Sequence, residues 1–316
     1  MKIAILDLGT NTFHLLIAEI SEKGEWKKLF KSKMVVKLGE GAIDRNEIAI
    51  NPFKRGIKAM KHYKNIIDSY KPNKVIAFAT SAIRSASNGE DFVATVMKET
   101  GINIQVIDGD REAHLIYLGV KQCIDLANSC SLIIDIGGGS TEFIICNEKE
   151  IFWKFSYNIG AARLLAIFKP SDPITNSELE TIRSFLNNEL KPMFEAVEKF
   201  KPINLIGSSG SFDTFAEMIG YQFHGRNIIK GITSYKFDMR EYFQLYSHIL
   251  FSTIAERKKF KGLVKMRVDM IVLAAICTTL VIEKTGLKSM ALSKYALKEG
   301  VLAQEISKVK KITSKI

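Results

Sequence analysis

Residues 7–19 read DLGTNTFHLLIAE, and residues 135–147 read DIGGGSTEFIICN. In both stretches an aspartate and a glycine stand at the end of an apolar run, and a small polar turn then leads into a second apolar run. Each stretch therefore predicts two strands joined by a tight turn. Because the same unit opens each half of the chain, we expect two related domains.

Alternating patterns surround both units. Apolar runs predict strands at 3–8, 13–20, 75–79, 102–107, 132–136, 143–146 and 204–206. Helical periodicity predicts helices at 53–67, 92–98, 112–120 and 178–199, a further helix from Phe212, and a mainly helical region from Tyr242 onward. This alternation predicts an α/β fold with helices on the faces of its sheets, and we place the domain boundary near residues 120–130.

Composition and charge narrow the classes of partner. The 316 residues are 47% hydrophobic and 25% charged, which is typical of a globular protein with a sizeable core. A formal charge of +11 attracts anions of every kind, so it does not name a ligand. No basic stretch has the spacing of a nucleic-acid motif, and the lysine-rich residues 308–315 are interpreted as a solvated terminus. We therefore expect no nucleic-acid partner.

Membrane insertion and metal–thiol chemistry are also disfavoured. The uncharged segment Met270–Ile282 is shorter than the roughly 20 residues of a membrane-spanning helix, so it predicts a buried core helix. Asp7 interrupts the apolar amino terminus, which argues against a signal peptide. The four cysteines have no CxxC spacing and predict reduced thiols. We expect a cytoplasmic protein that does not associate with a membrane.

The turns of the two repeated units have the composition of phosphate-binding loops. Phosphate binding requires accessible backbone N–H groups, small side chains and hydroxyl donors. The candidates are Gly9, Thr10, Asn11 and Thr12 in the first turn, and Gly137, Gly138, Gly139, Ser140 and Thr141 in the second. One such turn alone also fits a hairpin without a ligand, but two equivalent turns favour phosphate.

A third candidate loop follows the strand at 204–206. It contains Gly207, Ser208, Ser209 and Gly210 at a strand-to-helix junction, where backbone N–H groups can face an anion. The chain has no GxxxxGK[ST] motif and no GxGxxG that enters a crossover helix. A P-loop or dinucleotide enzyme is therefore disfavoured.

Charged residues next to these loops suggest metal and phosphate chemistry. An unpaired carboxylate at the end of an apolar strand is costly, so Asp7 and Asp135 are each expected to meet a cation or a hydrogen-bond donor. The alternative is that each accepts hydrogen bonds only from N–H groups of its own turn. Mg²⁺ needs only one or two carboxylates, and Glu142 is a further candidate. Arg84 can hold a phosphate through paired N–H donors, although an exposed arginine after a strand is also common on surfaces. Glu112 by itself fits a first-turn glutamate stabilised by the helix dipole.

Taken together, these motifs resemble the exopolyphosphatase and guanosine pentaphosphate phosphatase (Ppx/GppA) family of the actin, sugar kinase and Hsp70 superfamily. The resemblance is carried by IDIGGGSTEF (134–143), ATSAIRSASN (79–88), GDREAHLIYLGV (109–120), NIGAARL (158–164) and IGSSGSFDT (206–214). It implies two actin-like (ribonuclease H-like) domains, 1–124 and 125–296, with the active site in the cleft between them. A helix at about 297–316 is expected to pack back on the first domain.

The resemblance also implies roles for individual residues. Asp7 and Gly9–Thr12 fall on the first phosphate loop, and Asp135 with Gly137–Thr141 on the second. Arg84 matches the arginine that holds a phosphoryl group, and Glu112 matches the base that activates water, which replaces its interpretation as a helix-dipole residue. Asp135 and Glu142 match the acidic side that binds Mg²⁺ or another divalent cation.

The implied activity is that of an exopolyphosphatase, a hydrolase that releases orthophosphate from the ends of polyphosphate. The alternative is removal of the 5′-terminal phosphate of guanosine pentaphosphate, which uses the same residues, and the sequence does not separate the two. A non-catalytic nucleotide or polyphosphate sensor is disfavoured by Glu112 and both loops. A sugar kinase is disfavoured because no sugar pocket is recognisable. The resemblance also raises homodimerisation, which the sequence itself does not show.

Overall fold

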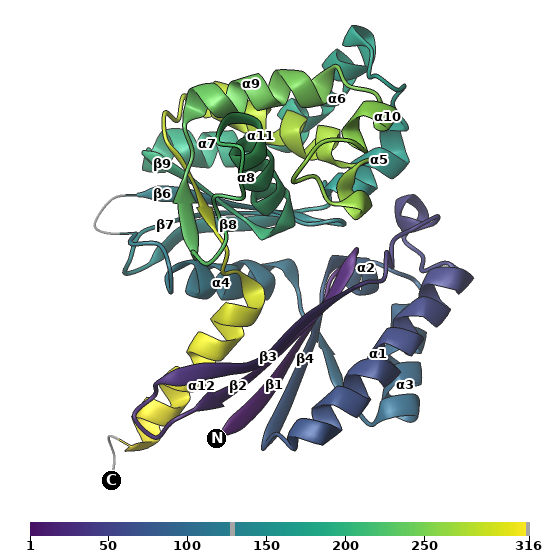
Figure 1. Cartoon of the computed structure of the whole chain (residues 1–316), viewed down its shortest axis with the longest axis vertical. Coiled ribbons are helices and arrows are strands. Elements are labelled where there is room, and N and C mark those ends of the chain that lie inside the picture. The colour runs from purple at the N-terminus through teal and green to yellow at the C-terminus, as the bar shows by residue number, and fades with distance from the viewer. Residues whose placement is uncertain (127–129, 314–316) are drawn as a thin grey trace. The chain divides into compact units, whose positions relative to one another are not determined.

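The computed structural model describes residues 1–126 and 130–313, and the chain divides into two compact units (Figure 1). Unit 1 contains residues 1–119 and 297–316, and unit 2 contains residues 120–296. Each unit has a mixed sheet with helices packed on it, which confirms the predicted fold class. Among the described residues, no helix has the length and apolar content needed to cross a membrane.

The sheet of unit 1 has the strand order β3-β2-β1-β4-β5. Its strands are β1 (Lys2–Leu8), β2 (Thr12–Ile20), β3 (Trp26–Val35), β4 (Lys74–Ala79) and β5 (Ile104–Val106). The strands β1, β2 and β3 pair antiparallel, whereas β4 joins β1 in parallel and β5 continues in parallel. The carboxyl ends of β1 and β4 consequently lie at the same edge of the sheet, and this edge carries the first predicted loop.

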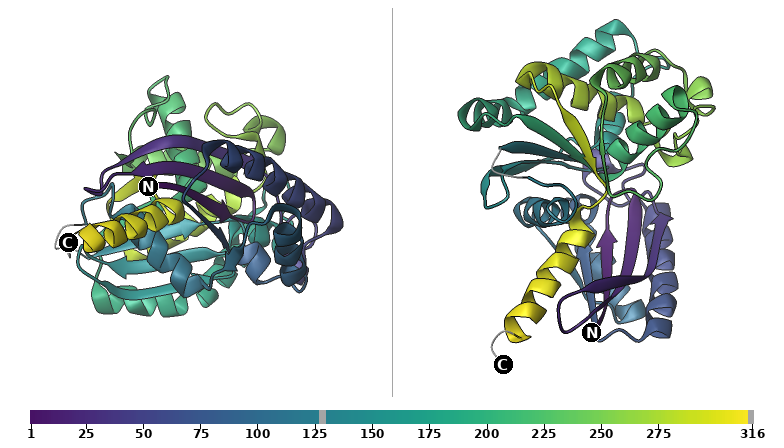
Figure 2. Two further views of the ribbon diagram at one scale, coloured as in Figure 1. Left: turned by 90° about the horizontal axis from the view of Figure 1, so that it is seen from below. Right: turned by 60° about the vertical axis from the view of Figure 1, so that its left-hand side comes forward.

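Helices cover both faces of this sheet. They are η1 (Ile43–Arg45), α1 (Ile50–Tyr70), α2 (Ser81–Arg84), α3 (Gly89–Thr100), α4 (Gly109–Val120) and α12 (Leu297–Thr313). Alternate residues of β1, such as Leu6, join the core under α1 and α3, whereas Ile3 and Ile5 face the other way. α12 runs along β1, as the right-hand view of Figure 2 shows. Burial on both faces explains why residues 3–6 of β1 are continuously apolar.

Unit 2 repeats the same topology with one additional edge strand. Its sheet has the order β10-β11-β9-β6-β7-β8. The strands are β6 (Ser131–Ile136), β7 (Thr141–Cys146), β8 (Ile151–Tyr157), β9 (Asn204–Ser208), β10 (Ser234–Lys236) and β11 (Met290–Ser293). β6, β7 and β8 pair antiparallel and β9 and β11 follow in parallel, as in unit 1. The duplication predicted from the two strand–turn–strand units is confirmed.

The helices of unit 2 pack on one face of its sheet (Figure 1). They are α5 (Ala161–Phe168), α6 (Asn176–Glu189), α7 (Lys191–Phe200), α8 (Ser209–Phe223), α9 (Met239–Leu250), α10 (Ile254–Arg257), η2 (Lys265–Arg267) and α11 (Ile271–Thr285). In α11 every residue from Ile271 to Ile282 is buried, so the prediction of a core helix in this segment is confirmed.

Two sequence predictions need correction. The helix predicted at 178–199 is two helices that meet at Leu190, because Pro192 in the first turn of α7 lacks an N–H and cannot continue a helix from the preceding turn. The strands β3, β8, β10 and β11 were not predicted. β3 is an edge strand with many exposed lysines, a composition that protects a sheet edge but hides the apolar pattern.

Gly300 provides a test of how α12 packs in unit 1. A Cβ at this position would lie 1.8 Å from the carbonyl oxygen of Leu115 in α4. We expect Gly300→Ala to lower the free energy of unfolding by about 1–3 kcal/mol through overpacking. Ser307→Ala, at an exposed position of the same helix, is the control and should change it by less than about 0.5 kcal/mol. Equal urea midpoints for the two variants would contradict the close helix packing.

Candidate functional site

The first predicted loop is the turn between β1 and β2. Leu8 and Phe13 form the last strand pair, and the Gly9 N–H donates to the Thr12 carbonyl at 3.1 Å. The Thr10 carbonyl accepts from the Leu38 N–H at 2.6 Å. The Asn11 carbonyl accepts from the N–H groups of residues 36 and 37 at 3.0 and 2.9 Å. The carbonyls of this turn are therefore bound by the segment that follows β3.

The second loop, between β6 and β7, has the same arrangement. Ile136 pairs with Thr141, and the Gly137 N–H donates to the Ser140 carbonyl at 3.0 Å. The carbonyls of residues 137, 138 and 139 accept N–H groups from residues 160–163 at the start of α5, at 2.9 to 3.3 Å. Arg163 adds its Nε–H, which donates to the Gly139 carbonyl at 3.1 Å. This segment follows β8, as residues 36–39 follow β3.

These contacts determine where the loop N–H groups point. In a trans peptide the C=O and the following N–H point in opposite directions. With the carbonyls of residues 137–139 directed at α5, the N–H groups of Gly138, Gly139 and Ser140 are directed away from it. Successive N–H groups on one side of a turn form an anion-binding concavity. The geometry therefore suits phosphate in unit 2, and by the same reasoning the N–H groups of Asn11 and Thr12 suit it in unit 1.

Two acidic residues stand beside the second loop. Asp135 and Glu142 are register partners in β6 and β7, so their side chains share one face of the sheet. They are 5% and 1% exposed. Ser156 donates its hydroxyl to Glu142 Oε1 at 2.7 Å. Hydroxyl donors of this kind stabilise a buried carboxylate in its charged form.

Two serines of the third predicted loop donate hydrogen bonds to Asp135. Ser208 at the end of β9 and Ser209 at the start of α8 donate their hydroxyls to Asp135 Oδ2, at 2.6 and 2.7 Å. Gly207 packs against the ring of Phe212, and Gly210 lies directly against the guanidinium of Arg267. Both serine hydroxyls are thus bound to the Asp135 carboxylate. The predicted phosphate contact of this loop stays a proposal, and we assign it to the backbone N–H groups of the loop.

In unit 1, Arg84 and Glu112 form an ion pair. Arg84 donates to Glu112 Oε2 at 2.7 Å and to the Ile107 carbonyl at 3.0 Å. Glu112 is 7% exposed. The turn that carries Arg84 is tied to the first loop, because the Thr80 N–H donates to the Leu8 carbonyl at 3.3 Å. The pair therefore lies at the edge of the sheet that also carries the first loop.

Asp7 occupies the corresponding position in unit 1. Asp7 pairs with His14, whereas Asp135 pairs with Glu142. Unit 1 therefore has a histidine at the position where unit 2 has its second carboxylate. The ring of His14 instead hydrogen-bonds the Thr12 hydroxyl at 2.9 Å. The two repeats thus share a backbone design but carry different polar groups on it.

Sequence reasoning missed two arginines beside these loops. Arg163 is buried under the second loop, and the signal that could have found it is an isolated cation in the apolar segment 159–168. Arg267 donates to the Thr214 hydroxyl at 2.9 Å near the start of α8. Burial lowers the pKa of Arg267, and the nearby Asp213 and Glu217 oppose that shift. Each arginine brings positive charge to a glycine-containing loop of unit 2.

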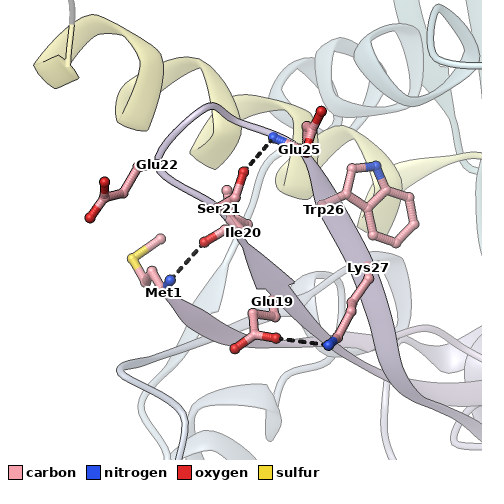
Figure 3. A pocket seen from close by; sticks show the side chains of 8 residues that line it. All are labelled: Met1, Glu19, Ile20, Ser21, Glu22, Glu25, Trp26 and Lys27. Carbon is pink, nitrogen blue, oxygen red and sulfur yellow. Dashed lines mark hydrogen bonds and ion pairs between the residues drawn. The ribbon is translucent and has the colours of Figure 1, made fainter.

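A recess of about 420 Å³ lies elsewhere in unit 1, at the turn between β2 and β3 (Figure 3). It is lined by Met1, Glu19, Ile20, Ser21, Glu22, Glu25, Trp26 and Lys27. None of the predicted site residues is among them. Lys2 pairs with Glu19 at this end of β1, whereas Asp7 stands near the other end of the strand.

The donor set in unit 2 fits a hard divalent cation. Asp135 and Glu142 offer two carboxylates on one face, and Mg²⁺ commonly uses one or two carboxylates and fills its remaining positions with water and phosphate oxygens. Within residues 1–126 and 130–313, no group of three or more histidine, cysteine or acidic side chains could hold a metal by itself. The arrangement therefore suits a cation shared with a phosphorylated ligand better than a closed protein site.

Known proteins that are similar to this chain include phosphatases. The model of the Ppx/GppA phosphatase family matches residues 16–309. A crystal structure of an exopolyphosphatase from Cytophaga hutchinsonii is 38% identical, with a TM-score of 0.94 over 98% of this chain and 99% of that one. Exopolyphosphatase 1 of Mycobacterium tuberculosis is 27% identical over 97% of this chain and 88% of its own length. The bifunctional 3-dehydroquinate synthase/phosphatase of Fusobacterium nucleatum is 36% identical over 67% of this chain, which spans only 33% of that protein.

Gly160 tests the support of the second loop. A Cβ here would lie 2.4 Å from the Gly138 carbonyl carbon and 2.5 Å from the Gly139 nitrogen. We expect Gly160→Ala to displace the loop and to weaken orthophosphate binding, measured by calorimetry, about tenfold, the cost of one hydrogen bond to a charged group. Ile167→Ala, at a position of α5 that is 47% exposed, should leave the affinity unchanged. Normal affinity in Gly160→Ala would show that the loop does not bind phosphate.

Proposed function

Because the chain belongs to the Ppx/GppA phosphatase family, we propose that it hydrolyses terminal phosphoanhydride bonds of polyphosphate and releases orthophosphate. Relatives named exopolyphosphatase support polyphosphate as the substrate. The observation that carries the proposal is the ion pair between partly buried Arg84 and buried Glu112 beside the first loop. A protein that only bound phosphate would have no use for a positioned carboxylate at this edge of the sheet, since a carboxylate repels an anion.

In the proposed reaction, the terminal phosphoryl group binds to loop N–H groups and to Arg84. Phosphoryl transfer depends mainly on positioning and on compensation of charge, so backbone donors and a guanidinium suit it. In unit 1 the Gly9–Thr12 loop and Arg84 are the proposed phosphate donors, and in unit 2 the Gly137–Thr141 loop is a second proposed phosphate-binding loop. Asp135 and Glu142 in unit 2 would hold Mg²⁺, which would supply charge compensation to phosphate oxygens.

Glu112 acts as the general base in this proposal. It accepts a proton from a water molecule while the water oxygen forms a bond to the terminal phosphorus. The bond between that phosphorus and the bridging oxygen breaks, and the shortened chain leaves as an anion. Orthophosphate and a chain one unit shorter are the products. The contact of Arg84 with Oε2 fixes the carboxylate and compensates its charge before substrate binds.

Replacement of Glu112 tests the proposal directly. We expect Glu112→Gln to lower the rate of orthophosphate release from polyphosphate by about 10²–10⁴-fold, the contribution typical of a general base. Glu90→Gln, in the exposed first turn of α3, is the matched control and should retain wild-type activity. Parallel assays with guanosine pentaphosphate decide whether that nucleotide is the better substrate. Unchanged release by Glu112→Gln would contradict the proposed role of Glu112.

The proposed role of Asp135 and Glu142 in Mg²⁺ binding is tested by measuring how activity depends on the Mg²⁺ concentration. We expect Asp135→Asn and Glu142→Gln each to raise the Mg²⁺ concentration needed for half-maximal activity by about tenfold or more. Each substitution replaces a negatively charged carboxylate ligand by a neutral amide. Glu150→Gln, an exposed residue beyond β7, should not change it. An identical Mg²⁺ dependence in all four proteins, wild type included, would show that this pair does not hold the cation.

A further inference from the structure

Ser81 is buried, and its hydroxyl has no hydrogen-bond partner within residues 1–126 and 130–313. The residue is 2% exposed, and its Oγ makes no hydrogen bond to any residue that the structure describes. A buried hydroxyl without a partner loses its bonds to water and gains nothing in return, so such groups are rare and call for an explanation. A ligand is one explanation, and the position of Ser81 supports it.

The position of Ser81 is fixed by the backbone around it. It is the first residue of α2 and follows Thr80, whose N–H is bonded to the Leu8 carbonyl just before Gly9. Arg84 is three residues further on in the same helical turn, so the two side chains share one face of that turn. Ser81 therefore follows a residue bonded to the strand end before the first loop, and it begins the helical turn that carries Arg84.

The Thr80 and Ser81 carbonyls already accept two donors each. The Thr80 carbonyl already accepts the N–H groups of Ile83 and Arg84, at 3.1 and 3.0 Å. The Ser81 carbonyl accepts both the N–H and the hydroxyl of Ser85, at 2.9 and 2.8 Å. The acceptor must therefore come from outside the turn, and beside a guanidinium that acceptor is expected to be an anionic oxygen.

We propose that the Ser81 hydroxyl donates a hydrogen bond to a non-bridging oxygen of the bound terminal phosphoryl group. The inference rests on the proposed function and adds a substrate contact to it. It assigns Ser81 and Arg84, from one helical turn, to the same phosphoryl group. The inference has one distinguishing consequence: loss of the hydroxyl weakens phosphate binding without lowering the stability of the folded protein.

The test compares Ser81→Ala with Ser85→Ala in the full chain. Ser85 lies in the same turn, but its hydroxyl is bonded to the Ser81 carbonyl. We expect Ser81→Ala to unfold at the wild-type temperature or above, because it removes an unpaired polar atom. Its orthophosphate Kd and its KM for polyphosphate should rise by about tenfold or more, as for one hydrogen bond to a charged acceptor. Ser85→Ala should show the opposite pattern, a lower unfolding temperature with near-normal binding.

Two results would overturn the inference. One is a Ser81→Ala protein whose orthophosphate Kd and KM are within twofold of wild type, which would mean that a buried water or nothing at all meets the hydroxyl. The other is a lower unfolding temperature in Ser81→Ala with normal binding, which would mean that the hydroxyl is structural. Failure of the proposed function is a separate result: the wild type would release no orthophosphate from polyphosphate or guanosine pentaphosphate, and the orthophosphate titration would still decide the role of Ser81.

Discussion

The orientation of the peptide groups in two hairpin turns is the constraint on which the rest of the site depends. A turn between antiparallel strands leaves several backbone groups outside the ladder, and each of them needs a partner. In both units the carbonyls of the turn are bound by the segment that follows the third strand, residues 36–39 in unit 1 and 160–163 in unit 2. The N–H groups of the same peptides are thereby turned away from that segment, and we propose that they bind phosphate. Glycine is needed at position 160 because a Cβ there would lie 2.4 to 2.6 Å from backbone atoms of Gly138 and Gly139.

The polar side chains around this framework are expensive to bury and are stabilised by specific donors. Asp135 receives two serine hydroxyls, Glu142 receives one, and Glu112 receives the guanidinium of Arg84. Hydrogen bonds to charged groups contribute about 1.5–3 kcal/mol each, which offsets part of the cost of removing a carboxylate from water. The carboxylates are consequently held in fixed positions, which the proposed catalysis requires.

The sequence was sufficient for the repeated strand–turn–strand unit because both of its determinants are local. An apolar run, a glycine-rich turn and a second apolar run specify the hairpin without reference to the rest of the chain. The same local signals predicted the central strands and the buried helix α11. They failed at β3, whose exposed lysines mask the pattern, and at Leu190, where the effect of Pro192 on the preceding turn outweighed helical periodicity.

The contacts that orient the site could not be predicted in this way, because they join residues far apart in the chain. Ser208 and Ser209 are distant in sequence from Asp135, and the pairing of Arg84 with Glu112 depends on the register of β4 and β5 and on the start of α4. Sequence composition suggested that the loop with these serines faces an anion. In the structure the two serine hydroxyls donate hydrogen bonds to the Asp135 carboxylate. The unpaired hydroxyl of Ser81 likewise becomes visible only when every neighbouring acceptor has been located.

The central claim is that the backbone N–H groups of the two turns bind phosphate. It is tested most directly by an NMR titration of the ¹⁵N-labelled protein with orthophosphate in the presence of Mg²⁺, following the backbone amide resonances. The account predicts that the amides of Gly138, Gly139 and Ser140 in the second turn, and those of Asn11 and Thr12 in the first, shift most and saturate. Shifts confined to the lysine-rich end of α12, with the amides of both turns unmoved, would contradict it.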